Sequence, residues 1–134
     1  MYRTYQSEGF AVLDFPCNQF GKQAPGSSAD IHSFCTARYD ISFPQFQKIE
    51  VNGENELELY TYLKSKQGFH GFGDSLDGAF LRKKLEKEDP GYETNSDIKW
   101  NFTKFLIDRT GEVIARFEPS EDMEKVEEAV KKVL

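Results

Sequence analysis

The sequence has 134 residues and two cysteines, Cys17 and Cys35, and both are candidates for thiol chemistry because a thiolate is a strong nucleophile. Cys17 follows an apolar segment at residues 10–15, in a loop of the kind where sites collect in α/β sheets. Cys35 lies on the predicted inner face of a helix. Both also fit as small buried hydrophobic side chains. Two cysteines make no disulfide scaffold, so we expect a reducing, cytoplasmic setting.

Hydrogen-bond donors that could support a thiolate lie far along the chain from the cysteines. Trp100 carries an N–H group and no acceptor, and the neighbouring Asn101 carries two amide N–H groups. Together at the start of a predicted strand they could bind a thiolate or an oxyanion, although a lone tryptophan is more commonly part of a core. Gln23, taken alone, is an ordinary loop amide.

A metal site has weak support in this sequence. Four side chains could act as ligands, but they show neither C-x-x-C nor H-x-x-x-H spacing. They are Cys17, His32, Cys35 and His70. The carboxylates are spread along the chain without an evident acid–base pair. We therefore predict no metal and no other cofactor.

Length and charge limit the class of protein. A chain of 134 residues predicts one domain, covering residues 1–134. The net charge is −6 and no basic stripe is present, which argues against nucleic acid or an anionic membrane as a partner. Apolar runs reach only three or four residues, whereas a membrane-spanning helix needs about 20. The first twenty residues have no signal-peptide pattern.

Local patterns predict an α/β domain. The chain opens like the end of a helix stopped by Gly9, and a buried strand at residues 10–15 follows. Ser27 or Ser28 caps a helix whose inner face holds Ile31, Phe34 and Cys35. The next predicted elements are an extended segment at 43–51 and a helix at 56–65.

The second half predicts a hairpin and a final helix. Residues 67–97 are irregular and read as a surface insertion with one helix at 79–87. Strands at 98–107 and 112–117 are joined by a short turn. Ser120 is the predicted cap of the last helix. The buried stripe of that helix is expected to comprise Met123, Val126, Val130 and Val133.

Four ordered motifs carry a family resemblance. Residues 14–23 read D-F-P-C-N-Q-F-G-K-Q and resemble the F-P-C-N-Q-F-G-x-Q segment of glutathione peroxidases. Three further family segments are matched in the same order, at residues 43–46, 51–53 and 99–105. The resemblance covers nearly the whole chain and is weakest over residues 67–97.

The resemblance implies a thioredoxin-like fold, with a mixed sheet flanked by helices, and reduction of hydrogen peroxide or organic hydroperoxides in the response to oxidative stress. In this family a reactive cysteine or selenocysteine is held among three side chains, which correspond here to Gln23, Trp100 and Asn101. Cys35 matches the resolving cysteine of members that use thioredoxin. The resemblance therefore favours thioredoxin over glutathione as the reductant.

One departure from the family pattern concerns the reactive residue. The family's peroxidatic residue precedes the F-P-C-N-Q motif, at the end of a strand before the first helix. Because this sequence opens within that helix, we expect it to lack both the first central strand and the peroxidatic residue, and Cys17 corresponds to a different family cysteine. Two alternatives stay open: a non-catalytic thioredoxin-like binding or sensing module, and an inactive fragment.

Overall fold

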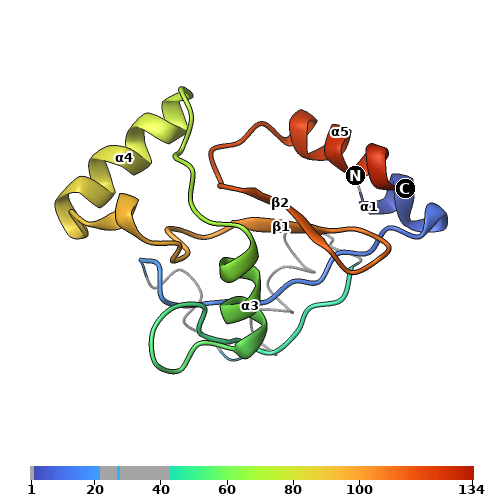
Figure 1. The fold of residues 1–134 in the computed structure, drawn as a ribbon, viewed down its shortest axis with the longest axis horizontal. Helices are drawn as coiled ribbons and strands as arrows, with labels where there is room; N and C mark the ends of the chain where they lie inside the picture. The colour runs from blue at the N-terminus through green and yellow to red at the C-terminus, as the bar shows by residue number, and fades with distance from the viewer. Residues whose placement is uncertain (1, 22–26, 28–42) are drawn as a thin grey trace. The chain divides into compact units, whose positions relative to one another are not determined.

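The computed structural model describes residues 2–21, 27 and 43–134 (Figure 1). The chain divides into two compact units, one comprising residues 1–56 with Leu134 and the other residues 57–133. None of the helices in the described ranges is long and apolar enough to span a membrane.

The first unit opens with a short helical segment that ends at a glycine, as predicted. Helix α1 (Tyr2–Tyr5) continues into a 3₁₀ turn, η1 (Gln6–Glu8). Gly9 has φ 97°, and its N–H group donates to the carbonyl of Gln6 at 3.2 Å. Glycine adopts this left-handed conformation without a Cβ penalty, so the helix stops here.

The predicted strand at residues 10–15 is wrong as a regular element. A single parallel bridge joins Asp14 to Gln45, and the side-chain amide of Gln45 also donates to Asp14 Oδ2 at 2.7 Å. Pro16 and Pro44 flank this bridge and have no N–H group, so a regular ladder cannot extend through them. Leu13 is 56% exposed, which also contradicts burial between two layers.

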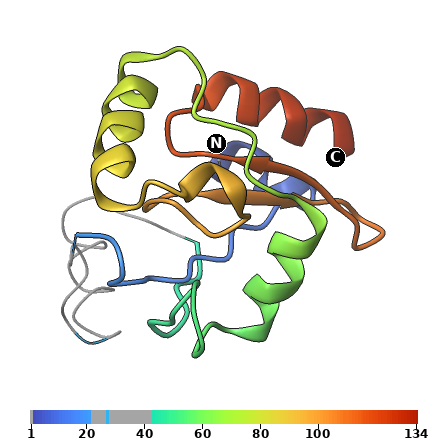
Figure 2. The same ribbon diagram turned by 60° about the vertical axis from the view of Figure 1, so that its left-hand side comes forward.

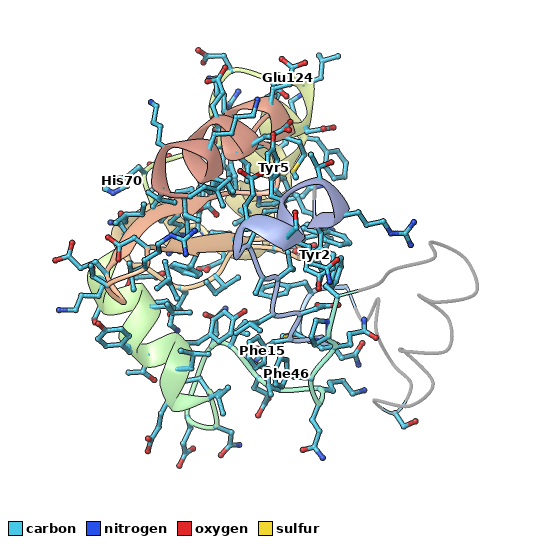
Figure 3. The ribbon with its side chains drawn as sticks, turned by 90° about the vertical axis from the view of Figure 1, so that its right-hand side faces the viewer. Tyr2, Tyr5, Phe15, Phe46, His70 and Glu124 are labelled. Carbon is cyan, nitrogen blue, oxygen red and sulfur yellow. The ribbon has the colours of Figure 1, made fainter. Side chains whose placement is uncertain are left out.

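Aromatic contacts hold this segment and residues 43–46 together. The rings of Phe15 and Phe46 stack, with their centroids 4.9 Å apart. Figure 3 labels these two side chains. Tyr2 lies edge-on to Phe43, with their ring centroids 5.7 Å apart. The helix predicted after Ser27 or Ser28 lies outside the described residues.

The second unit contains three α-helices, a 3₁₀ turn and a hairpin in its described residues. The helices predicted at 56–65 and 79–87 are confirmed, the first displaced by one or two residues and the second extended at both ends. The elements are α3 (Glu58–Lys66), α4 (Leu76–Glu88), η2 (Tyr92–Thr94), β1 (Lys104–Ile107), β2 (Val113–Phe117) and α5 (Met123–Val133).

Strands β1 and β2 form the predicted antiparallel hairpin. Phe105 pairs with Arg116, and the register shifts between Leu106 and Ile107. Asp108 Oδ1 accepts hydrogen bonds from the backbone N–H groups of Thr110 and Glu112, at 2.9 and 3.0 Å, and so closes the turn. In Figures 1 and 2, α5 lies on one side of this hairpin and α3 on the other.

Residues 67–97 were predicted to be a surface insertion, and this is wrong, because they carry the buried cluster of the second unit. Phe72, Leu81, Leu85 and Tyr92 are each 6% exposed or less and pack together. Leu81 and Leu85 lie on one face of α4, Phe72 precedes this helix, and Tyr92 begins η2. The glycines and Pro90 that suggested an irregular loop therefore shape the connections around a core.

Helix α5 is capped by Asp122 and not by Ser120. Asp122 Oδ1 accepts the N–H group of Glu124 at 2.9 Å, whereas the Ser120 hydroxyl donates to the carbonyl of Phe72 at 2.6 Å. Val126 and Val130 are buried as predicted. Met123, the first residue of the helix, is 47% exposed, so the buried stripe begins one turn later than the pattern indicated.

Candidate functional site

The Cys17 thiol lies in a loop of the first unit and is half-buried. It donates to Gln19 Oε1 at 3.4 Å, and the backbone N–H group of Gln19 donates to the Cys17 sulfur at the same distance. Both contacts are local, because the loop folds back on itself over two residues. The thiol is therefore held by its neighbour and still reaches the surface.

Gln19 joins two of the sequence motifs and was missed in the sequence analysis. Its Oε1 atom accepts the N–H groups of Val51 and Asn52 at 2.8 and 3.2 Å, and its Nε2 atom donates to the carbonyl of Asn52 at 2.9 Å. A primary amide has both a donor and an acceptor, so it can pair with a backbone as another peptide would. Its place in the F-P-C-N-Q motif was the only available signal.

Trp100 and Asn101 lie in a turn of the second unit, before β1, and do not open the strand as predicted. The next residue, Phe102, has φ 68°, a left-handed conformation that interrupts extended backbone. The Thr103 hydroxyl donates to the carbonyl of Trp100 at 3.3 Å and closes the turn. The strand consequently begins at Lys104.

The Trp100 ring has a defined environment. It packs against the buried cluster of Phe72, Leu81, Leu85 and Tyr92. The Lys84 ammonium lies 5.0 Å from the ring centroid, a cation–π distance. Trp100 and Asn101 are both half-buried.

Buried charged side chains lie just before Trp100 and at the end of the hairpin, a feature that the sequence pattern did not reveal. Lys99 is 4% exposed, and its ammonium donates to Asn95 Oδ1 at 2.6 Å. Burial lowers the pKa of Lys99, and the nearby Asp97 charge opposes that shift. On β2, Arg116 is paired with the Glu118 carboxylate at 2.7 Å.

Glu118 is the most unusual carboxyl in the described part of the chain. Burial raises its pKa above the usual range, and the charges of Arg116, Lys99 and His70 offset that rise only in part. Its Oε1 atom is buried and has no hydrogen-bond partner among the described residues. The ion pair with Arg116 lowers the pKa of Glu118. The loss of hydration at this 8% exposed side chain raises the pKa by more, so the net shift is upward.

The predicted site residues are only partly covered by the structure. Trp100 and Asn101 are adjacent in one turn, whereas Gln23 and Cys35 lie outside the described residues, as does His32. Across residues 2–21, 27 and 43–134, no three His, Cys, Asp or Glu side chains gather as a metal site would require. Of the predicted site residues, the structure therefore describes only the two donors Trp100 and Asn101.

Comparison with known proteins places the chain in a family. The family model described as Glutathione peroxidase matches residues 1–64. A glutathione peroxidase homolog of Neisseria meningitidis is 46% identical over 138 residues, covering all of this chain and 74% of the relative. The chain belongs to the glutathione peroxidase family. The homolog BsaA of Staphylococcus aureus, 40% identical, is likewise matched over the whole chain and 70% of its own length.

Solved structures of glutathione peroxidases share the fold. T. cruzi GPX1 superposes with a TM-score of 0.63 at 32% identity, and Trgpx in its apo form with 0.60 at 30% identity. Each comparison covers 98% of this chain, which spans 65% and 64% of those two chains. The fold class is thus the thioredoxin-like α/β fold of this family, as the motifs predicted.

Proposed function

We propose that this chain serves thiol-dependent reduction of hydrogen peroxide or organic hydroperoxides, with thioredoxin preferred over glutathione as the reductant. The observation that carries the proposal is the Trp100–Asn101 turn of a glutathione peroxidase family member, in which the Trp100 indole packs against a buried cluster and the Asn101 amide follows it directly in the chain. N–H donors directed at a sulfur favour its thiolate form.

The roles follow from that chemistry. A thiolate or selenolate attacks one oxygen of the hydroperoxide, so that a bond from the attacking atom to this oxygen forms as the O–O bond breaks. The attacking atom becomes a sulfenic or selenenic acid, and the leaving alkoxide or hydroxide takes up a proton and departs as an alcohol or water. We assign Gln23, Trp100 and Asn101 as donors to the attacking atom. Cys35 is assigned as the resolving thiol, which condenses with the acid to form a disulfide and release water. Thioredoxin then returns two electrons to that disulfide.

Neither Cys17 nor Cys35 is assigned the peroxidatic role, which gives a direct test on the 134-residue chain. The fully reduced chain is mixed with one equivalent of hydrogen peroxide, and peroxide and free thiols are followed with time. We expect peroxide loss no faster than with a free thiol. Fast loss that disappears in Cys17→Ser or Cys35→Ser would overturn the assignment.

The peroxidase function itself is tested on protein that is expressed from the natural gene and purified through a C-terminal tag. NADPH consumption is measured with cumene hydroperoxide and either the thioredoxin or the glutathione reducing system. We expect turnover with thioredoxin, lowered about a hundredfold by Asn101→Ala because one donor to the attacking atom is lost. Asn55→Ala, at an exposed site, is the matched control. Absence of turnover with both reductants would refute the function.

A thioredoxin-like binding module is the second candidate. The observation in its favour is the half-buried Cys17 thiol, which is hydrogen-bonded and still accessible. A stable mixed disulfide formed through Cys17, with no peroxide turnover in the gene-derived protein, would select this function over the first.

A further inference from the structure

Arg116 occupies an unusual position for a strand residue. Its backbone pairs with Phe105 in the hairpin, and its charged side chain is only 1% exposed. The guanidinium carbon lies 5.9 Å from the centroid of the Phe69 ring and 5.6 Å from that of the Phe105 ring. A cation placed against two aromatic rings, away from water, keeps its position only if its N–H groups are satisfied.

Those N–H groups are directed at the backbone just before the Trp100 turn. One terminal nitrogen donates to the carbonyl of Ser96 at 2.7 Å, and the other donates to the carbonyl of Asp97 at 2.9 Å. The first also reaches the carbonyl of Gln67 at 3.4 Å. The planar guanidinium can hold two successive carbonyls at once, which an ammonium cannot do with the same geometry.

Glu118 fixes the orientation of the guanidinium. Its Oε2 atom accepts the Arg116 Nε–H group at 2.7 Å, and its side chain is 8% exposed. With Nε occupied by the carboxylate, the two terminal nitrogens face residues 96 and 97. Charge-assisted bonds of this kind are short and directional.

The chain between this anchor and Trp100 has little freedom. Ile98 and Lys99 are 5% and 4% exposed, and the Lys99 ammonium returns to Asn95. Only two residues separate Asp97 from Trp100, so a displacement of the Asp97 carbonyl is transmitted to the turn. On its other side, the Trp100 ring rests on the buried cluster and near Lys84.

We propose that Arg116 is a positioning residue for the Trp100–Asn101 turn, which it holds through the carbonyls of Ser96 and Asp97, with Glu118 as its orienting partner. Packing of the hairpin face requires only an apolar side chain at this place, whereas the two carbonyl contacts require the guanidinium fork. The role of the turn in peroxide chemistry rests on the proposed function, but the positioning itself does not.

The test compares Arg116→Lys with Arg109→Lys, the same substitution at an exposed site in the same hairpin. Trp100 is the only tryptophan, so tryptophan fluorescence reports on this turn alone. In Arg116→Lys we expect a shifted emission maximum, stronger acrylamide quenching and about a tenfold loss of hydrogen-exchange protection in residues 96–101, because a charge-assisted bond is lost. Protection within α4 and all values in Arg109→Lys should match the wild type.

Unchanged Trp100 emission and unchanged protection of residues 96–101 in a folded Arg116→Lys variant would overturn the proposal. If that variant does not fold, Glu118→Gln is measured in the same way, since it keeps an accepting oxygen but weakens the anchor of the guanidinium. Equal loss of protection across the whole second unit would mean a general structural role and would also overturn it. All of these readouts are independent of peroxidase activity, so a failure of the proposed function leaves this test intact.

Discussion

Gly78 lies in the first turn of α4, where the structure predicts that substitution by alanine lowers the stability of the protein. A Cβ atom built on Gly78 would lie 2.7 Å from the carbonyl oxygen of Phe72 and 3.0 Å from that of Gly73. Neither oxygen is free to move, because Ser120 donates to the first at 2.6 Å and the Arg82 guanidinium donates to the second. Phe72 is itself part of the buried cluster.

The magnitude for Gly78→Ala follows from two opposing effects. In an unobstructed helix, alanine is more favourable than glycine by about 1 kcal/mol. Overpacking against fixed neighbours costs about 1–3 kcal/mol, and weakening the Ser120 hydrogen bond adds about 1 kcal/mol. We therefore expect a net loss of about 1–3 kcal/mol in the free energy of unfolding, where helix propensity alone predicts a gain.

The assay is equilibrium urea unfolding followed by circular dichroism, with Gly91→Ala as the control. Gly91 has φ −89°, and a Cβ there would meet only Thr94 Oγ1 at 3.8 Å. The control should keep its stability or gain about 0.4–1 kcal/mol, because alanine restricts the unfolded chain. If Gly78→Ala is as stable as the control, residues 72–73 do not pack against α4 as the structure has them.

Three further predictions concern residues elsewhere in the chain. Gln19→Glu should lose about 1–3 kcal/mol of unfolding free energy at neutral pH, because it removes the donor to Asn52 and adds a charge near Glu50. Recovery of stability at acid pH in urea unfolding would support this origin, and no loss at neutral pH would contradict it. Because the folded-state pKa of Glu118 is raised, its favourable contribution is present below the unfolded-state pKa and is lost as pH rises through the folded-state pKa. Urea unfolding from pH 4 to 8 should therefore show Glu118→Gln gaining stability relative to the wild type with rising pH, and a change in the opposite direction would show that the Arg116 pair dominates. Val130→Ala, at a 2% exposed site on α5, should cost about 2 kcal/mol in a thermal or urea melt, and a variant as stable as the wild type would mean that α5 is not packed on the second unit.

Local sequence patterns determined the helices and the hairpin of the described residues. The helical stop at Gly9, the helices near residues 58–66 and 76–88, and the turn at Asp108 all depend on residues a few positions apart. Apolar spacing, capping side chains and turn residues act over that range, so they can be read from the sequence. The ordered motifs likewise determined the family, because their residue types and order are properties of the sequence itself.

Strand formation and the buried cluster depended on partners distant in the sequence. The apolar pattern at residues 10–15 records a preference for burial, but prolines at 16 and 44 limit the pairing to one bridge. The glycine-rich appearance of residues 67–97 concealed four core side chains, because glycine marks turns and says nothing of what the turns enclose.

The polar contacts of the candidate site were also decided by tertiary structure. Gln19 meets Val51 across 32 positions, and Arg116 meets Ser96 across 20. Apart from the place of Gln19 in the F-P-C-N-Q motif, nothing in the sequence distinguishes these side chains from other glutamines and arginines on a solvated surface. A hydrogen bond depends on distance and direction between two particular atoms, and only the folded chain brings those atoms together.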